Sequence, residues 1–188
     1  MTNGETMTDS ELAQLKRDIQ ILKDTEAVKK VKHAYFRCID MANLEELKTL
    51  LHPKVHAKLI GGTYSIEFHD RDEYLEMVAN SFHAEFVGMH HGHHPEIEIL
   101  SETEATGKWY LQDIAMDFRR KVTTTGSSIY TDKYTKIDGK WVIYDTHYFR
   151  VYECVADTPE RPPLTAHYLA EHGRKELTYT VVDKYNKA

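Results

Sequence analysis

Apolar side chains in the first forty residues recur at the three- and four-residue spacing that is typical of amphipathic helices. The first stripe follows the capping residues Asp9 and Ser10 and consists of Leu12, Leu15, Ile19 and Leu22. Asp24 and Thr25 then offer a new N-cap. The pattern therefore predicts a second helix with one apolar side made of Val28, Val31, Tyr35, Cys38 and Ile39.

Beyond these helices the pattern changes to that of strands. Asn43 and Asp70 are placed to cap two further short helices, and the first of these ends before Pro53. Extended segments with strand composition cover residues 55–60, 64–68, 86–91, 96–100, 105–118, 127–137 and 140–152. Asp138-Gly139 joins the last two in a tight hairpin. Helices packed on one face of a long, curved antiparallel sheet make an α+β domain.

The chain divides into three parts along its length. Residues 1–23 are predicted to form an N-terminal helical extension, residues 24–155 the central domain and residues 156–188 a C-terminal extension. The C-terminal part begins with a proline-rich stretch and then carries a short helix at 164–172 and a candidate strand at 177–182. The narrow apolar stripe of the N-terminal extension suits packing against another subunit, so we expect a homo-oligomer.

Composition and charge exclude several classes of function. With 188 residues, 41% hydrophobic and 29% charged, the chain has the make-up of one soluble globular domain. A formal net charge of −6 argues against a nucleic-acid partner. Residues 1–11 are polar and acidic, which predicts neither a signal peptide nor a membrane span. Cys38 and Cys154 make no disulfide framework, and we expect a cytoplasmic location.

The candidate chemistry is concentrated in two neighbouring strands. Four histidines occupy five positions between residues 90 and 94, and histidine is the side chain that titrates near neutral pH. On the strand that follows, Asp113 shares one face with Trp109 and Leu111. A carboxylate on an apolar face is costly unless it is used, and desolvation is expected to raise the pKa of Asp113. A proton-shuttling pocket needs such a set.

The order of these motifs resembles a known family. The segments that carry the resemblance are Glu26-Ala27-Val28, Tyr35-Phe36-Arg37-Cys38-Ile39-Asp40, Met89-His90-His91-Gly92-His93-His94-Pro95-Glu96-Ile97, Ala105 to Asp113, Tyr130 to Tyr134 and Asp138 to Trp141. Over roughly residues 20–153 they resemble the SnoaL-like branch of the nuclear-transport-factor-2-like (NTF2-like) superfamily, and within it most of all the bacterial bile acid 7α-dehydratases. The resemblance implies a cone-shaped fold in which helices close a curved, mostly antiparallel sheet around an apolar pocket.

The resemblance also implies roles for particular residues. Tyr35, His90 and Asp113 match the catalytic tyrosine, histidine and aspartate of the dehydratases. Asp40 matches an aspartate that pairs with the histidine in related lyases, and Arg150 matches an arginine of the substrate pocket. Between residues 58 and 65 a pocket tyrosine is not evident. A trimer is implied by the same resemblance, whereas dimers are common elsewhere in the superfamily.

Elementary chemistry agrees with several of these assignments. Elimination of water needs a base for the carbon proton and an acid for the leaving hydroxyl. His90 is a candidate for one role, Asp40 can hold its tautomer, Asp113 can carry a proton, and the Tyr35 phenol can bond a carbonyl or enolate oxygen. We expect substrate contacts from His93, Trp109, Tyr130, Tyr148 and Arg150. The expected function is a lyase without cofactor or metal that acts on a bulky, largely apolar hydroxy-carbonyl compound such as a steroid.

Other interpretations remain open at this point. Tyr35 can be a core aromatic, Asp40 a helix-end residue, and Arg150 a structural partner of Asp113 or Asp145. Histidines 91 and 93 with Glu98 have the spacing of a cupin metal site, although a second cupin segment is missing. The same fold can serve as a non-catalytic ligand carrier. Related enzymes with the same proton chemistry would instead remove formaldehyde from a diaryl-propane diol, or isomerise or cyclise a polyketide.

Overall fold

The computed structural model describes residues 7–185, so the outermost parts of the two predicted extensions, residues 1–6 and 186–188, lie outside the described residues. The helices are α1 (Asp9–Asp40), α2 (Leu44–Leu50), α3 (Arg71–Ser81), α4 (Tyr168–His172) and α5 (Val181–Tyr185). The strands are β1 (Leu51–Ile60), β2 (Ser65–Phe68), β3 (Phe86–Ile99), β4 (Glu104–Asp117), β5 (Val122–Ile137) and β6 (Lys140–Asp157).

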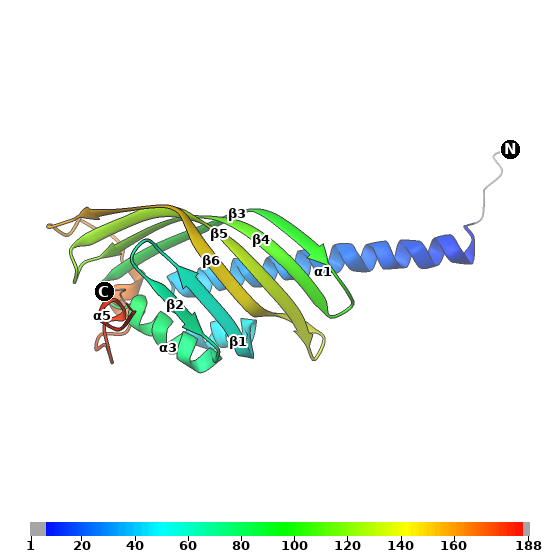
Figure 1. The fold of residues 1–188 in the computed structure, drawn as a ribbon, viewed down its shortest axis with the longest axis horizontal. Coiled ribbons are helices and arrows are strands. Elements are labelled where there is room, and N and C mark those ends of the chain that lie inside the picture. Colours follow the sequence, from blue (N-terminus) through cyan, green and yellow to red (C-terminus); the bar gives the residue numbers. More distant parts are fainter. Residues whose placement is uncertain (1–6, 186–188) are drawn as a thin grey trace.

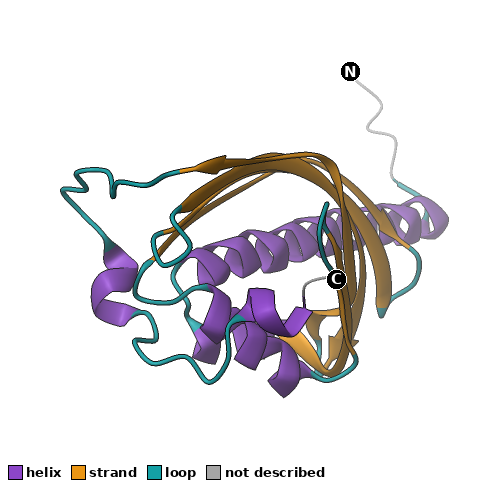
Figure 2. Cartoon of the chain, turned by 60° about the vertical axis from the view of Figure 1, so that its left-hand side comes forward, coloured by secondary structure: helices purple, strands orange, loops and turns teal. Residues whose placement is uncertain are grey.

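A single six-stranded sheet organises the described residues, in the order β2-β1-β6-β5-β4-β3. Neighbouring strands are antiparallel except for β1 and β6, which run parallel. The sheet is strongly curved and arches over the helices (Figures 1 and 2). The predicted α+β architecture, with N-terminal helices on one side of a curved and mostly antiparallel sheet, is confirmed.

The first helix is one continuous rod and not the two helices predicted. It runs for 32 residues and begins at a capping box in which Thr8 and Glu11 accept hydrogen bonds from each other's backbone N–H groups. Asp24 does not cap a new helix because its carboxylate accepts a hydrogen bond from Trp141 Nε1 at 2.8 Å and pairs with Lys136 Nζ at 2.8 Å. The first half of α1 extends beyond the sheet (Figure 1). None of the described helices combines the length and the apolar composition needed to cross a membrane.

The strands are longer and fewer than predicted. The segments predicted at 86–91 and 96–100 are replaced by one strand, β3, which ends at Ile99 and whose pairing with β4 shifts register between His93 and Glu96. His94 has a φ of 49° at this irregularity, so the chain bends there without leaving the sheet. The hairpin at Asp138-Gly139 is confirmed, with φ values of 50° and 75°.

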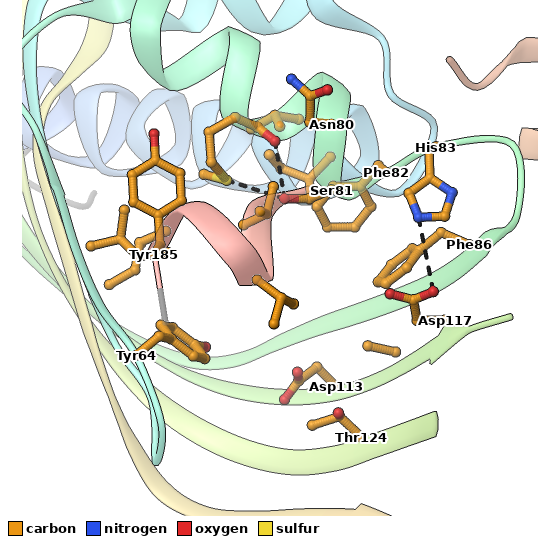
Figure 3. A pocket seen from close by; sticks show the side chains of 18 of the residues that line it. Tyr64, Asn80, Ser81, Phe82, His83, Phe86, Asp113, Asp117, Thr124 and Tyr185 are labelled. Atoms are coloured by element: carbon orange, nitrogen blue, oxygen red, sulfur yellow. Dashed lines mark hydrogen bonds and ion pairs between the residues drawn. The ribbon is translucent and has the colours of Figure 1, made fainter. Parts of the chain in front are cut away.

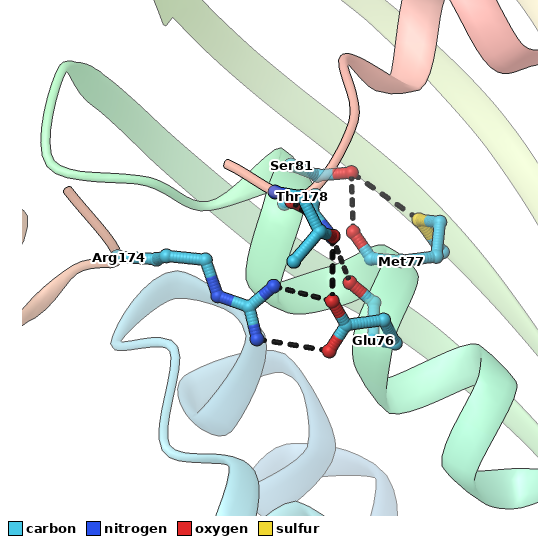
Figure 4. A network of polar contacts seen from close by, with 6 residues as sticks. Glu76, Met77, Ser81, Arg174 and Thr178 are labelled. Carbon is cyan, nitrogen blue, oxygen red and sulfur yellow. Dashed lines mark hydrogen bonds and ion pairs between the residues drawn. The ribbon is translucent and has the colours of Figure 1, made fainter. Parts of the chain in front are cut away.

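The C-terminal residues return to the helices and do not form the predicted strand. Arg174 pairs with both carboxylate oxygens of Glu76 on α3, at 2.5 and 2.9 Å (Figure 4). The backbone N–H of Thr178 donates to Asn80 Oδ1 at 3.0 Å, and its hydroxyl donates to Glu76 Oε1 at 2.8 Å. Since the chain is bonded to these side chains and not to a neighbouring strand, the strand predicted at 177–182 is wrong, and α5 begins at Val181.

Candidate active site

A cavity of about 290 Å³ lies inside the curve of the sheet. Its wall combines residues of α1, α3 and strands β3 to β6 with the C-terminal segment. Figure 3 shows His83 and Asp117 at one end of this cavity and Tyr64 and Tyr185 toward the other. Its volume is close to the lower end of the range of roughly 300–1,000 Å³ that is usual for small-molecule sites. The fold therefore provides an enclosed place for a small ligand.

The clearest candidate for proton chemistry at this wall is a histidine–aspartate pair. Asp40 is the last residue of α1, and its Oδ1 lies 2.6 Å from His90 Nδ1 on β3. Its other oxygen accepts the backbone N–H of His90 at 3.0 Å. A carboxylate on Nδ1 favours the tautomer with its proton on that nitrogen and leaves Nε2 as the available base. The predicted pairing of Asp40 with His90 is thus present in the geometry.

Two aromatic rings contact the His90 imidazole. The ring stacks on Phe36 of α1 with an interplanar angle of 11° and also contacts Phe82. A Cβ atom at position 92 would collide with the Phe36 ring, and Gly92 allows β3 to approach α1 closely enough for this stack. The glycine within the histidine run therefore serves the position of His90.

Asp113 lies directly opposite His90 in the β3–β4 pair, but it is not an isolated carboxylate. Arg150 on β6 places Nη1 2.5 Å from Asp113 Oδ1, and its Nε lies 2.9 Å from Glu153 Oε2. Burial opposes the charge of Arg150, but the hydrogen bond that it donates to Asp113 and the charge interactions with Asp113 and nearby tyrosines together outweigh burial, so the pKa of Arg150 is raised. The structural interpretation of Arg150 as the partner of Asp113 fits this geometry.

Tyrosines form a second polar element of the cavity wall. The hydroxyls of Tyr35 and Tyr74 are 2.5 Å apart, and those of Tyr64 and Tyr148 are also hydrogen-bonded. Burial raises the pKa of these four phenols, and that of Tyr130 between them, above the ordinary value. They therefore remain protonated at neutral pH and can donate hydrogen bonds to a ligand.

A buried ion pair behind the tyrosines has no counterpart in the sequence-based predictions. Lys32 Nζ lies 2.8 Å from Asp132 Oδ2, and both side chains are completely buried. The ammonium also lies 3.6 Å from the centroid of the Tyr130 ring, a cation–π contact. Asp132 accepts further hydrogen bonds from Thr146 and Tyr134, at 2.7 and 2.8 Å.

Two predicted substrate contacts lie away from the cavity. Trp109 is buried in the core, where its Nε1 donates to the Tyr134 hydroxyl at 3.1 Å. It does not belong to the cavity wall because its side of β4 is covered by α1, as its edge-on contact with His33 indicates. His93 lines a separate shallow hollow with Asp40 and the outer edge of His90. Direct contact of Trp109 and His93 with a ligand in the main cavity is therefore not supported.

The histidine run does not assemble the cupin-like metal site. His91 and His93 have ring centroids 6.0 Å apart, and in residues 7–185 no group of three metal-ligating side chains includes either of them or Glu98.

The structure adds wall residues that sequence reasoning missed. Tyr64 is the pocket tyrosine that was not evident between residues 58 and 65. His83 is 3% exposed with Nε2 4.0 Å from Asp117 Oδ1, and burial lowers its pKa. Tyr185 and Val181 bring the C-terminal extension onto the wall. No local pattern marks these positions, since each depends on how distant segments meet.

Comparison with known proteins agrees with this architecture. The model of the SnoaL-like domain family matches residues 20–147. A hexachlorocyclohexane dehydrochlorinase, LinA type 2, has a similar structure with a TM-score of 0.66 at 16% identity, over 78% of this chain and 98% of that chain. A candidate scytalone dehydratase from Novosphingobium aromaticivorans gives 0.63 at 20% identity, over 80% and 99%. An NTF2-like protein with a cystatin-like fold from the same organism gives 0.61 at 11% identity, over 77% and 92%.

At such low identities these structures show a shared fold, and two of the three carry the names of lyases. The family model is the stronger finding because it spans more than half of the chain. The protein belongs to the SnoaL-like domain family, with the α+β fold of the NTF2-like superfamily.

Proposed function

We propose that the protein is a cofactor-independent lyase that eliminates water from a bulky, largely apolar hydroxy-carbonyl compound. The observation that carries the proposal is the Asp40–His90 pair on the wall of a cavity that also holds Arg150 and buried phenols. Elimination requires a base that works near neutral pH and donors for developing negative charge, and this set supplies both. The lyase names of distant structural neighbours point the same way.

The proposed reaction begins at the carbon next to the substrate carbonyl. His90 Nε2 removes a proton from this carbon, and the electron pair of the C–H bond moves toward the carbonyl as an enolate. A phenol such as Tyr35, or the charged Arg150, stabilises the oxygen on which the negative charge develops. The electron pair then forms the carbon–carbon double bond as the C–O bond of the hydroxyl breaks. The proton held by His90 leaves with that hydroxyl as water.

Asp113 receives a positioning role in this scheme. Asp113 and Glu153 both accept hydrogen bonds from Arg150, and these two bonds fix the guanidinium on the cavity wall. Because the guanidinium occupies Oδ1 of Asp113, no proton transfer is assigned to this carboxylate. The proton chemistry is thereby assigned to His90, with Asp40 as its orienting partner.

The resemblance to bile acid 7α-dehydratases makes a steroid that carries a hydroxyl and a carbonyl group the first substrate to test. Isomerisation, cyclisation and loss of formaldehyde begin with the same proton removal, so only the substrate separates these reactions. A ligand carrier would not need a carboxylate that engages both Nδ1 and the backbone N–H of one histidine. The catalytic reading is therefore preferred over simple binding.

Oligomerisation is part of the proposal. Leu12, Leu15, Ile19 and Leu22 are each at least 42% exposed on the half of α1 that extends beyond the sheet. An exposed apolar stripe on a protruding helix favours association of copies of this chain, as a trimer or dimer. Sedimentation of the full chain, compared with a variant in which Leu15 and Leu22 are glutamate, tests this part by itself.

The decisive experiment is product analysis by mass spectrometry. Wild-type protein is incubated with a panel of hydroxy-carbonyl steroids and aromatic polyketides, and formation of the dehydrated product is followed. We expect loss of one water from at least one member and no such product with His90→Ala. Equal product from both proteins, or no turnover of any member by a folded wild type, contradicts the proposed function.

A further inference from the structure

A second cluster of histidines and carboxylates lies on the opposite, outward side of the sheet. It is formed by the parallel pair β1 and β6, in which His56 is aligned with Asp145 and Lys58 with His147. Because side chains alternate along a strand, Val55, Ala57 and Thr146 point inward and are completely buried, while His56, Asp145 and His147 point outward. The cluster is therefore separate from the catalytic cavity, and no part of the proposed reaction uses it.

The ring nitrogens and carboxylate oxygens of this cluster lie close to one another. His56 Nδ1 lies 3.0 Å from Asp145 Oδ2 and 3.1 Å from His147 Nε2. His147 Nε2 in turn lies 3.2 Å from Asp145 Oδ1. The three side chains thus form a triangle, in which the two ring nitrogens face each other and each carboxylate oxygen of Asp145 faces a different ring nitrogen.

The size of this triangle is close to what a metal ion imposes. Zinc bonds of about 2.0–2.1 Å at tetrahedral angles place neighbouring ligand atoms about 3.3 Å apart. The N···N distance of 3.1 Å, and the N···O distances of 3.0 and 3.2 Å from the two ring nitrogens to different oxygens of Asp145, are within a few tenths of an ångström of this value. A metal ion would therefore find three of its ligands in place with almost no movement of the backbone.

The surroundings of His56 supply the support that metal-binding histidines usually have. Its second nitrogen, Nε2, lies 2.8 Å from Glu67 Oε1 on β2. Metal-ligating histidines commonly donate their other N–H to a carboxylate, which fixes the tautomer that exposes the ligating nitrogen. His69 stacks on the His56 ring with centroids 4.6 Å apart and restricts its rotation.

We propose that His56, Asp145 and His147 bind a divalent transition-metal ion of the zinc class, with the fourth position open to water. Two imidazoles with one carboxylate are a ligand set suited to zinc. Lys58 and Lys133 are aligned with His147 and Asp145 on the adjacent strands, and their positive charges oppose the cation. The ion would join β1 to β6 just after their pairing shifts register between Leu51 and His56.

The test is zinc binding to the full chain, prepared without a histidine tag and stripped of metal. Calorimetry with Zn²⁺ is expected to give one ion per chain. His147→Gln and Asp145→Asn are expected to weaken binding by on the order of a hundredfold, and Glu67→Gln by about tenfold. A double variant, His91→Ala with His93→Ala, is the matched control for binding by the exposed histidine run and should bind as the wild type does.

Two further measurements keep the result unambiguous. At a hundredfold excess over Kd, zinc should raise the Tm of the wild type by on the order of 5 °C and leave that of a folded His147→Gln variant unchanged. If His147→Gln fails to fold, Glu67→Gln decides, because its side chain is 42% exposed at the sheet edge and its loss leaves the core intact.

Absence of stoichiometric zinc binding by the wild type overturns the proposal. Loss of binding in the His91 and His93 double variant does so as well, since the ion would then sit on the histidine run. The same holds if His69→Ala abolishes binding while His147→Gln does not, because the ion would lie between His56 Nε2, Glu67 and His69.

Discussion

The two faces of one sheet use the same residue types for different chemistry. On the concave face, His90 has one nitrogen bonded to Asp40, and its ring contacts Phe36 and Phe82. On the outer face, the ring nitrogens of His56 and His147 point at each other and at Asp145. A single oriented imidazole facing an apolar cavity suits proton transfer, whereas two converging imidazoles suit a metal ion.

Strand β6 shows how one segment serves both faces. Tyr148 and Arg150 face the cavity, and the alternate positions Asp145 and His147 face outward. Thr146, between Asp145 and His147, is completely buried, and its hydroxyl donates a hydrogen bond to Asp132, the partner of Lys32. The function of each residue is thus decided by which face it occupies and by what lies opposite it.

The largest expected effect separates the two clusters by activity. With an active substrate in hand, His90→Ala should lower kcat by a factor on the order of 10²–10⁴, the usual cost of removing a general base. Asp40→Asn should lower it less, since the base remains but loses its orienting partner. His56→Ala and His91→Ala serve as controls, and both should turn over within about twofold of the wild type. A large loss of kcat in His56→Ala would show that the outer cluster also contributes to turnover.

A second prediction concerns the ion pairs that Arg150 makes with Asp113 and Glu153 on the cavity wall. Arg150→Met leaves Asp113 and Glu153 without their cation, and removing one member of a buried pair costs about 3–5 kcal/mol. We expect a matching fall in the free energy of unfolding in urea, together with loss of turnover. Arg150→Lys keeps the charge and should recover part of the stability but little activity, because an ammonium cannot contact both carboxylates in the same fork geometry. Full activity in either variant would remove Arg150 from the proposed mechanism.

Chelation should act on the outer cluster alone. If the outer site holds zinc, EDTA should lower the Tm of zinc-loaded protein by a few degrees, because a ligand that binds only the folded state stabilises it. Turnover measured well below Tm should not change, since elimination at His90 relies on side-chain acids and bases. Activity that disappears with EDTA and returns with one divalent ion would show instead that the metal takes part in catalysis.

Much of this fold follows from local patterns, and the exceptions have a common cause. The caps at Asn43 and Asp70 and the turn at Asp138-Gly139 depend on neighbouring residues only, and all three are present. Asp24 has the same local pattern as a cap, but Trp141, far along the chain, occupies its carboxylate. The sequence alone does not reveal such a partner, so the predicted break in α1 is wrong.

The candidate site divides in the same manner. The alternation of strands was sufficient to place Asp113 on an inward face, and the family resemblance was needed to pair Asp40 with His90. Lys32 had a local signal, since it falls on the buried stripe between Val28 and Tyr35, although a lysine there is easily taken for a surface residue. The outer cluster had no local signal in the sequence, because His56 and His147 are separated by 91 residues and meet only through the parallel pairing of β1 with β6.

The smallest expected effect concerns the C-terminal segment, which covers the inner cavity but does not cover the outer cluster. Glu76 anchors that segment, and its hydrogen bond from Arg174 lowers the pKa of the carboxyl from 4.5 to about 2. A carboxyl whose pKa is lower in the folded state stabilises the protein at pH values above the pKa of the unfolded chain. This stabilisation is lost as the pH falls toward 2. Because Glu76 is 39% exposed, solvent screening limits its contribution to about 1 kcal/mol or less.

We therefore expect Glu76→Gln to lower the free energy of unfolding slightly at pH 6, and the difference from the wild type to shrink steadily below pH 4.5. Urea titrations at a series of pH values measure this difference directly. The same variant should raise KM more than it lowers kcat, because a loosened segment weakens the cover of the cavity while His90 stays in place. Zinc binding at the outer cluster should not change, and Glu73→Gln, in the first turn of α3, provides a control without an ion pair to Arg174. A difference between wild type and Glu76→Gln that is independent of pH would assign the effect to packing and not to the charge of Glu76.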